Sequence, residues 1–274
     1  MPESPALARS ALYLPAANAR AIEKAKGLAA DMLILDLEDS VAPADKPRAR
    51  LAAAEATRDT AFAGRWMGIR LNAAGTAEHA ADIETVRASA ARFAVLPKVE
   101  DAKIAAEVGA ALGVPLFAMI ETPKGVFAAR EIAAADGVSG LIAGMNDLAA
   151  ALRQPAQTSR GGLVLALQMI VLAARAAGGL ALDGVWNHLE DATGLEAECL
   201  EGKIFGFDGK TLIHPNQIAI ANRVYGPSQE ALEEARAMVE AATCGAERFR
   251  GRMIETMHVE AAKRLLAAAV LAGT

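Results

Sequence analysis

The chain has little of several residue types, and each shortage excludes a class of protein. Cysteine occurs twice, as Cys199 and Cys244, with neither a CxxC pair nor the Cys/His spacing of a zinc site. We therefore expect two free thiols in a reducing compartment. Positive charge is in deficit, because 28 Lys and Arg stand against 33 Asp and Glu. A general nucleic-acid binder needs a basic face, so we expect none here, while a local basic pocket for a phosphorylated ligand is compatible with this balance.

Long hydrophobic runs are also missing. The longest, GLVLALQMIVLAARAAG, is interrupted by Gln168 and Arg175 and is too short to span a bilayer, so we interpret it as a core-facing helix. The first residues, MPESPALARS, lack the basic and apolar regions of a signal peptide. These features predict a cytoplasmic protein with no membrane partner.

Apolar runs typical of buried strands recur eight times, and alanine-rich segments of helical period separate them. This alternation predicts a (β/α)8 TIM barrel over residues 1–223, followed by a helical extension over 224–274 with helices at about 228–243 and 258–272. The alternative is an open doubly wound sheet, which would need a GxGxxG or GxxxxGK[ST] loop that the sequence lacks. The predicted strands are 11–16, 31–38, 65–72, 93–99, 115–122, 138–145, 180–187 and 203–213.

Carboxylates crowd the end of the second predicted strand. The apolar run 32–35 is followed by Asp36, Glu38 and Asp39. Three like charges at one strand end repel each other and are costly to desolvate, so a cation or a chemical role is needed to explain them. In barrels of this type the catalytic groups lie at the carboxyl ends of the strands.

Two further acids, Glu121 and Asp147, end the neighbouring fifth and sixth strands and can converge on one ion. Mg2+ is commonly held by one or two carboxylates and keeps several waters, so this pair predicts a magnesium site. Asp36, Glu38 and Asp39 would then accept hydrogen bonds from metal-bound water. The alternative for any single acid is a helix cap, as Asp147 could provide for LAAAL.

The bases at the strand ends are few. Arg70 suits a substrate carboxylate or carbonyl, although a buried arginine more often forms a structural ion pair. Lys98 is compatible both with a role at this site and with an ion pair to Glu38 or Glu100. No Ser-His-Asp or Cys-His pattern is readable, and His214 is the one histidine at a strand end. The other candidates for substrate binding at strand ends are Pro15 and Asn18.

Eight motifs in series resemble the citrate lyase β-subunit-like, or CoA-ester lyase, family of the HpcH/HpaI aldolase group. The resemblance runs from residue 9 to about 223 in the family's order and spacing. The motifs are RSALYLPAANARAIEKA, LILDLEDSVAPADKPRAR, IRLNAAGT, LPKVE, MIETPKGV, GMNDLAAAL, AARAAGGLALDGV and GFDGKTLIHPNQI.

The resemblance implies a (β/α)8 barrel, a homotrimer, Mg2+ and a CoA-thioester substrate. The family's metal ligands correspond to Glu121 and Asp147, and its active-site arginine to Arg70. Lys46 and Arg50 correspond to contacts with the phosphates of CoA, and the stretch GFDGKTLIHP, which contains His214, to the pantetheine channel. The implied reaction is the reversible cleavage of malyl-, citramalyl- or citryl-CoA into acetyl-CoA and a 2-oxo acid.

The chain departs from the family in two places. The family's C-terminal MID-x-P loop supplies a catalytic Asp from a neighbouring subunit, and this chain has MIETMH, with Glu255 at the Asp and Met257 at the proline. Glutamate has a similar pKa but one more methylene. The family's DLAADLG is also altered, with Ala151 and Arg153 at the second Asp and the Gly. The catalytic candidates are therefore Arg70, Glu38, Asp39 and Glu255.

Three other functions are compatible with these residues. A class II pyruvate-type aldolase would act on free hydroxy-oxo acids, but that branch has a histidine after the second strand, where this chain has LEDSVAP. The thioester could instead be carried on an acyl-carrier protein, as in the citrate lyase complex. The altered lid acid also fits a barrel that binds CoA or metal without turnover.

Overall fold

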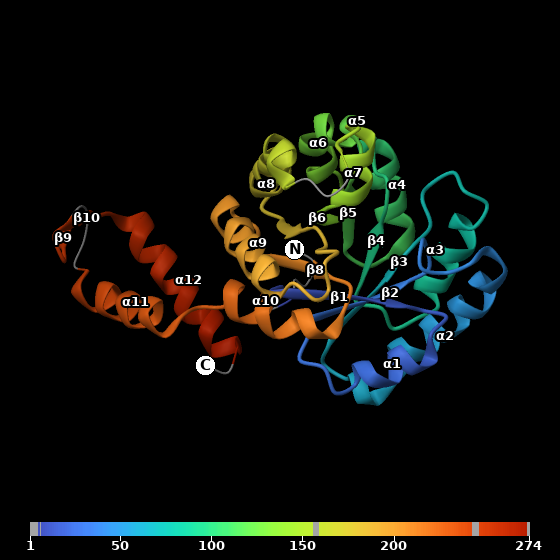
Figure 1. Cartoon of the computed structure of the whole chain (residues 1–274), viewed down its shortest axis with the longest axis horizontal. Coiled ribbons are helices and arrows are strands. Elements are labelled where there is room, and N and C mark those ends of the chain that lie inside the picture. The colour runs from blue at the N-terminus through green and yellow to red at the C-terminus, as the bar shows by residue number, and fades with distance from the viewer. Residues whose placement is uncertain (1–4, 6, 156–158, 243–246, 273–274) are drawn as a thin grey trace.

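Eight parallel strands close into a barrel surrounded by helices (Figure 1). The computed structural model describes residues 5, 7–155, 159–242 and 247–272. Each strand pairs with the next along the chain, and β8 returns to β1, which confirms the predicted (β/α)8 barrel and excludes the open sheet. The strands are β1 (Ser10–Pro15), β2 (Met32–Asp36), β3 (Trp66–Arg70), β4 (Phe93–Leu96), β5 (Leu116–Ile120), β6 (Val138–Ala143), β7 (Leu180–Asp183) and β8 (Gly209–Leu212).

The helices between the strands begin and end where the sequence supplies caps. Asp101, for example, accepts from the backbone N–H groups of Lys103 and Ile104, and the same helix ends at Gly113 in the left-handed conformation. The barrel helices are α1 (Ala19–Ala25), α2 (Lys46–Arg58), α3 (His79–Arg87), α4 (Ala102–Leu112), α5 (Pro123–Phe127), α6 (Ala129–Ala133), α7 (Met145–Ala151), α8 (Val164–Ala176), α9 (Ala192–Phe205) and α10 (Ile218–Tyr225), with 3-10 turns η1 (Pro43–Asp45), η2 (Thr60–Phe62), η3 (Arg160–Leu163) and η4 (Pro215–Gln217).

The core has two layers, one inside the barrel and one between the strands and the helices. Two aromatic rings, Phe93 and Phe117, fill the barrel interior with their centroids 5.4 Å apart. Gly68 makes room for the first ring, because a Cβ there would lie 2.4 Å from the Phe93 ring. The rings thus close the barrel below its functional end.

The eighth strand is shorter than predicted. Residues 203–205, expected at its start, are the last turn of α9. That helix ends at Gly206, whose φ of 99° is a left-handed conformation that suits glycine. The strand prediction was wrong there because a short run with apolar residues does not by itself distinguish a helix end from a strand, and Ile204 is 82% exposed in the structure.

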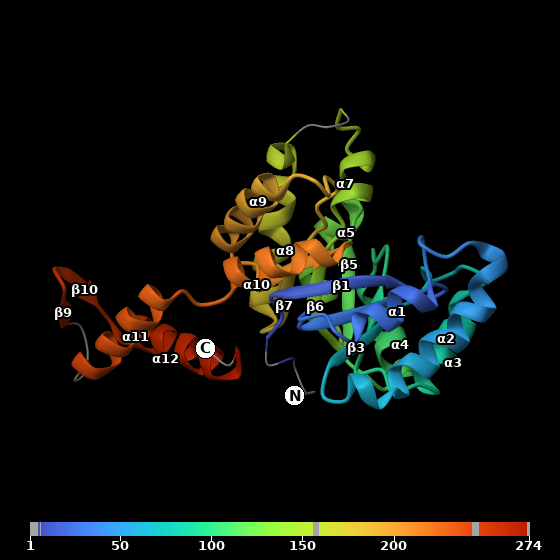
Figure 2. The same cartoon turned by 60° about the horizontal axis from the view of Figure 1, so that its bottom comes forward.

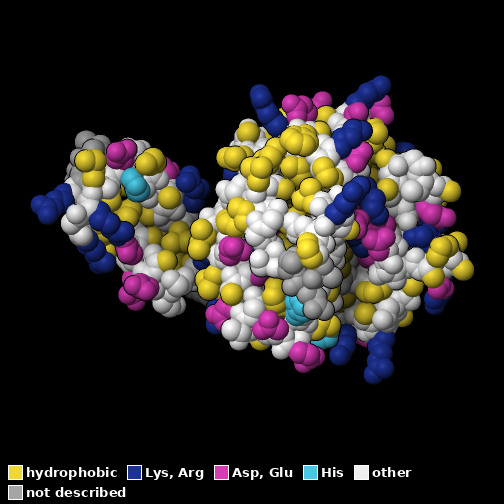
Figure 3. Space-filling model, turned by 45° about the horizontal axis from the view of Figure 1, so that its top comes forward, with side chains coloured by type: hydrophobic (Ala, Val, Ile, Leu, Met, Phe, Trp, Pro, Cys, Tyr) yellow, Lys and Arg dark blue, Asp and Glu magenta, His cyan; other side chains and the backbone are white. Residues whose placement is uncertain are grey.

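The C-terminal segment forms an arm outside the barrel. It consists of α11 (Gln229–Ala241) and α12 (Thr256–Ala272), which pack on each other and are joined by a hairpin of β9 (Glu247–Phe249) and β10 (Arg252–Ile254). Figures 1 and 2 both show the arm projecting away from the barrel, and Figure 3 shows it as a separate lobe on a narrow neck. The helical extension is confirmed, whereas the hairpin was not predicted. None of the described helices is long and apolar enough to cross a membrane.

The arm leaves the barrel from the end opposite to the strand carboxyl ends. Asn222, near the end of α10, donates to the carbonyl of Ala29 at 2.8 Å and accepts from the hydroxyl of Ser10 at 2.7 Å. Ser10 is the first residue of β1, and Ala29 precedes β2, so this end of α10 lies at the amino ends of the strands. The arm therefore does not cover the carboxyl-end face of its own barrel.

Candidate metal and substrate site

A cavity of about 390 Å3 opens at the carboxyl ends of the barrel strands. Its lining contains the residues that the sequence predicts for metal and substrate from five different strands or the loops that follow them. These are Pro15, Asp36, Asp39, Arg70, Glu121 and Asp147. The barrel thus gathers residues that are up to 132 positions apart in the chain, from 15 to 147, into one site.

Glu121 and Asp147, the predicted metal ligands, both line this cavity. Glu121 directly follows β5, is 5% exposed and accepts the backbone N–H of Lys98 at 2.6 Å. The Lys98 backbone has a φ of 53°, an uncommon conformation for a residue with a side chain. Gly144 lets Glu121 approach, since a Cβ at 144 would lie 2.3 Å from its Cβ and 2.5 Å from its Oε2.

The setting of Glu121 opposes its own negative charge. Burial, together with the charges of Glu38 and Asp147, raises the pKa of Glu121 to about 7. An all-oxygen donor pair with excess negative charge fits a hard divalent cation such as Mg2+. No group of three or more His, Cys, Asp or Glu suited to a metal occurs in the described part of the chain, so water or substrate oxygens would complete the coordination.

Arg70 is fixed at the end of β3 by two carboxylates. Its Nε and Nη2 donate to the two oxygens of Asp36 at 2.6 and 2.7 Å, and its Nη1 lies 2.9 Å from Glu38 Oε2. Its guanidinium also sits over the Tyr13 ring, 4.8 Å from the centroid. Burial alone would raise the pKa of Asp36, but the hydrogen bonds and charge of Arg70 bring it below its ordinary value. Asp36 and Glu38, two of the three acids predicted at this strand end, therefore orient this arginine.

Lys98 connects the two groups of acids. Its Nζ lies 2.8 Å from Glu38 Oε1 and 3.7 Å from Asp147 Oδ2. Of the two partners that the sequence suggested for this lysine, the structure shows Glu38, while Glu100 accepts from the Thr122 hydroxyl. Burial raises the pKa of Glu38 despite its two basic neighbours.

The predicted CoA contacts lie outside this cavity and are engaged within the chain. Lys46 is buried, and its Nζ donates to the carbonyls of Leu37 and Glu38 and to the side chain of Asn72 at 2.7–3.0 Å. Arg50 bonds Asp82 at 2.7 Å and also pairs with Glu78. A phosphate contact by either base stays a prediction and would require these bonds to rearrange.

Asn18 and His214 serve as helix caps. The Asn18 side chain accepts from the N–H of Ala21 at 3.1 Å at the start of α1. His214 forms a capping box with Gln217 at η4. Neither lines the cavity, so their roles in substrate binding stay predictions.

Glu255, the predicted lid acid, stands far from its own cavity. It is exposed at the hairpin end of the arm, just before α12, where its N–H donates to His258 Nδ1 at 2.9 Å. The buried thiol of Cys199 lies between α9 and α10, while Cys244 is outside the described residues.

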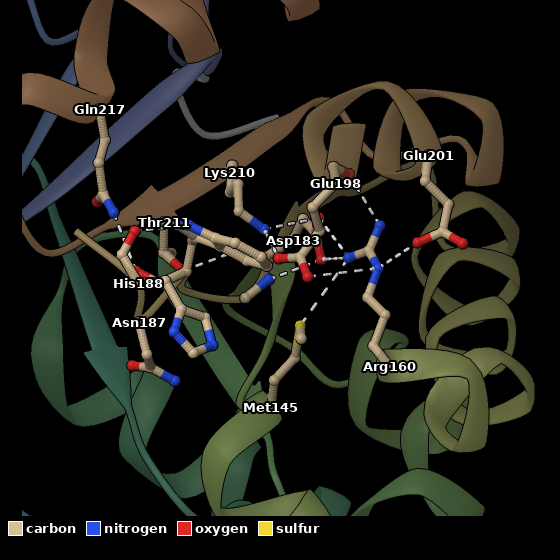
Figure 4. A network of polar contacts seen from close by, with 12 residues as sticks. Met145, Arg160, Asp183, Asn187, His188, Glu198, Glu201, Lys210, Thr211 and Gln217 are labelled. Carbon is tan, nitrogen blue, oxygen red and sulfur yellow. Dashed lines mark hydrogen bonds and ion pairs between the residues drawn. The ribbon is translucent and has the colours of Figure 1, made fainter. Parts of the chain in front are cut away.

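A buried ionic cluster beside the site was not predicted (Figure 4). Arg160 lies 2.8 Å from Asp183, and Lys210 approaches Asp183 at 3.1 Å and Glu198 at 2.7 Å. Arg160 also pairs with Glu201. Asp183 and Lys210 lie on barrel strands, whereas nothing in the sequence marks Arg160, which comes from a polar loop.

Comparison with known proteins gives one consistent picture. The sequence profile described as HpcH/HpaI aldolase/citrate lyase matches residues 9–215. A (3S)-malyl-CoA thioesterase of Cereibacter sphaeroides (strain ATCC 17023) is 40% identical over 269 residues, which cover 95% of this chain and 94% of that protein. A citrate lyase subunit beta-like protein of Mycobacterium tuberculosis (strain H37Rv) is 37% identical over 262 residues, or 93% of each chain.

A solved structure of similar fold supports the cofactor prediction. The protein CitE from Mycobacterium tuberculosis, in complex with magnesium, acetoacetate and coenzyme A, superposes with a TM-score of 0.83 at 36% identity. The match covers 95% of this chain and 97% of that one. The predicted resemblance and the predicted magnesium cofactor are thereby confirmed at the level of the family.

Proposed function

The chain belongs to the HpcH/HpaI aldolase/citrate lyase family, and from this premise we propose that it is a Mg2+-dependent CoA-ester lyase. It would cleave or form a 3-hydroxyacyl-CoA such as malyl-, citramalyl- or citryl-CoA, with acetyl-CoA and a 2-oxo acid on the other side. One observation carries the proposal: the acid pair Glu121 and Asp147 shares a cavity with the fixed guanidinium of Arg70.

Glu121 and Asp147 would hold the metal. Bound Mg2+ would orient the substrate oxygens and lower the pKa of the β-hydroxyl. The backbone N–H of Lys98 fixes the Glu121 carboxylate, and Gly144 leaves it the space that it needs. The Lys98 side chain balances part of the surrounding negative charge, because it reaches both Glu38 and Asp147.

Arg70 would stabilise negative charge that develops on the thioester as the carbon–carbon bond breaks. Asp36 holds two of its five N–H donors and so fixes the plane of the guanidinium. The cavity-facing donors that remain suit a carbonyl or carboxylate oxygen. Such preorganisation is effective because no side chain must reorient during the reaction.

Glu255 would supply the proton for the new methyl group of acetyl-CoA, and it would come from a second copy of the chain in a homotrimer. The reach of the arm away from its own barrel supports this assignment. An exposed carboxyl at the tip of a lobe can enter a neighbouring cavity, and the arm leaves its own barrel at the end opposite to the cavity.

A second candidate is hydrolysis of the same thioester. It is favoured by the 40% identity to proteins named (3S)-malyl-CoA thioesterase. In that reaction an activated water would attack the thioester carbonyl, and the same acids and Arg70 could serve both reactions.

The products distinguish the two reactions. We would incubate the protein with (3S)-malyl-CoA and Mg2+ and measure glyoxylate and acetyl-CoA against malate and free CoA thiol. We expect glyoxylate and acetyl-CoA, with loss of both in EDTA and in Glu121→Ala. Malate and free thiol without glyoxylate would show that the protein is a thioesterase and not a lyase. If neither malyl-, citramalyl- or citryl-CoA nor an acyl-carrier-linked thioester gave a product, a binding role without turnover would be left.

The lid acid is tested in the same assay with two substitutions. Glu255→Ala should abolish cleavage while keeping Mg2+ binding, because the residue lies outside the metal pair. Glu255→Asp shortens the side chain by one methylene, and a shift on the order of 1 Å can change the rate about a hundredfold. Full activity in Glu255→Ala would remove this residue from the mechanism.

A further inference from the structure

A second and larger cavity, of about 790 Å3, lies beside the metal pair and has no role in the reaction described so far. We name it the side cavity. It adjoins the first cavity, because Met145, Asn146 and Val185 line both. Asn146 immediately precedes the candidate metal ligand Asp147. A ligand bound at the metal pair is therefore within a short reach of the side cavity.

The wall of the side cavity after β7 is held in place before any ligand binds. Asn187 Nδ2 donates to Asn146 Oδ1 at 2.7 Å, which ties the ends of β7 and β6 together. Trp186 donates from its indole to the carbonyl of His188 at 2.9 Å, and Gln217 donates to the carbonyl of Trp186 at 2.9 Å. A fixed wall of this kind lowers the entropy cost of binding.

Hydrogen-bonding side chains of several kinds line the side cavity. Asn146, Asn187, Gln154 and Ser159 contribute amide and hydroxyl groups, Trp186 an indole and His188 an imidazole. The charged members are Arg160, Glu198 and Glu201, and Arg160 is already paired with carboxylates.

Among the charged side chains of the lining, the two carboxylates are more exposed than the arginine. The side chain of Arg160 is 5% exposed, that of Glu198 10% and that of Glu201 45%. With Asp183 and Lys210 behind them, the cluster holds three carboxylates against two bases. A carboxylate or phosphate would therefore be repelled from the side cavity, whereas an amide or hydroxyl would not.

Building on the proposed function, we propose that the side cavity binds the substituent of the 2-oxo acid, and that this substituent is an uncharged hydrogen-bonding group such as a carboxamide or a hydroxyl. The substituent is the part of the acid that extends from the carbon bearing the hydroxyl after condensation. It is a hydrogen atom in glyoxylate, a methyl group in pyruvate and a carboxymethyl group in oxaloacetate.

Two probes of equal size test the charge preference directly. Oxaloacetate and 2-oxosuccinamate differ only in a terminal carboxylate against a carboxamide. We would titrate each into the protein with Mg2+ present, follow the heat of binding and the fluorescence of Trp186, and include pyruvate as the probe without a polar substituent. We expect 2-oxosuccinamate to bind at least about tenfold more tightly than oxaloacetate.

A substitution in the wall then tests the location. Asn187→Ala should reduce the preference for the amide to less than about threefold, because it removes one hydrogen-bonding side chain. Glu190→Ala is the matched control, since Glu190 is exposed on the same loop but lines neither cavity. It should keep the wild-type preference.

The other outcomes separate this inference from the function that it rests on. Two results would overturn the assignment of the side cavity: equal or tighter binding of oxaloacetate, or an unchanged preference for the amide in Asn187→Ala. Binding of pyruvate in the same experiment would still support the metal site. Loss of pyruvate binding in Asn187→Ala would show that Asn187 acts through Asp147, and it would also overturn the assignment of the side cavity. If no 2-oxo acid bound to the wild type with Mg2+, both the inference and the proposed function would fail.

Discussion

The surroundings of Glu121 favour the protonated form of its carboxyl group, and a bound cation would favour the ionised form. Its side chain is buried, Asp147 and Glu38 add negative charge, and the one compensating bond described is the N–H of Lys98. These effects place its pKa at about 7, near the pH at which the protein would work. A small change in pH therefore changes the fraction of chains that are ready to bind a cation.

We predict a pH-dependent affinity for Mg2+. A metal binds the deprotonated carboxylate, so protons compete with Mg2+ at Glu121 below its pKa. The dissociation constant should rise about tenfold for each pH unit below about 7 and level off above it. Calorimetric titrations with Mg2+ from about pH 5.5 to about pH 8.5 would measure this.

The Glu121→Gln variant serves as the control for that titration. Glutamine retains an oxygen to accept the Lys98 N–H but cannot carry the charge, so Mg2+ binding should be lost at every pH. Glu107→Gln, an exposed change on α4, should leave the titration unchanged. If the Mg2+ affinity of the wild type did not change with pH, Glu121 would be ionised throughout this range, and burial and neighbouring charge would not raise its pKa as described.

At the scale of secondary-structure elements, the cluster around Arg160 joins a 3-10 turn and a helix to the paired strands β7 and β8. Arg160 belongs to η3, Asp183 ends β7, Glu198 and Glu201 lie on α9, and Lys210 is in β8. One guanidinium therefore attaches the loop before α8 to a strand and a helix. That loop forms one wall of the side cavity.

We predict that Arg160→Ala lowers the free energy of unfolding by about 3 kcal/mol or more, since it removes one of the two bases that balance the buried carboxylate of Asp183. Arg175→Ala is the matched control. Arg175 also bonds a carboxylate, Asp208 at 2.8 Å, but its side chain is 42% exposed. Its removal should cost about 1 kcal/mol or less. Urea unfolding measures both, and equal losses would contradict the structural role of the cluster.

The barrel strands could be predicted from the sequence, whereas the cluster around Arg160 could not. The strands were predictable because each is an apolar run, although the runs 31–38 and 65–72 extend beyond the paired residues. Leu37 and Leu71 stay buried after the ladder ends, so burial and strand pairing do not stop at the same residue. Arg160 could not be assigned, because its partners Asp183 and Glu201 are 23 and 41 positions away.

The β9–β10 hairpin was missed for a local reason. Each strand has three residues, too few to show alternation. The turn itself carries a weak signal, Arg250 and Gly251, which both have positive φ, at 47° and 81°. Such a pair is typical of a tight hairpin turn, but Arg is an uncommon first member.

At the scale of the whole molecule, the proposed function requires the barrel and the arm to carry complementary parts of one site. The sequence predicted both the metal pair and the lid acid, and the structure shows the pair in one cavity and Glu255 on the arm outside it. The arm also exposes Met253 and Met257, at 70% and 64%, on either side of Glu255. Exposed apolar side chains beside a functional residue favour a surface that another chain covers.

We therefore predict that two inactive variants restore each other. Glu121→Ala lacks a metal ligand but has an intact arm, and Glu255→Ala has an intact barrel but no lid acid. If each site combines the barrel of one chain with the arm of another, unfolding and refolding equal amounts together should place an intact barrel beside an intact arm in about a quarter of the sites. The mixture should then recover about a quarter of wild-type turnover.

The two variants refolded separately and mixed afterwards are the control, and they should stay inactive for as long as subunits do not exchange. Recovery is specific to a site shared between chains, because a chain that used its own arm would be inactive in every combination. A mixture that refolds to wild-type oligomer size but shows no turnover would therefore place Glu255 outside the shared site. In that case the acid would have to come from the barrel itself, where Glu38 and Lys98 are among the titratable neighbours of the metal pair.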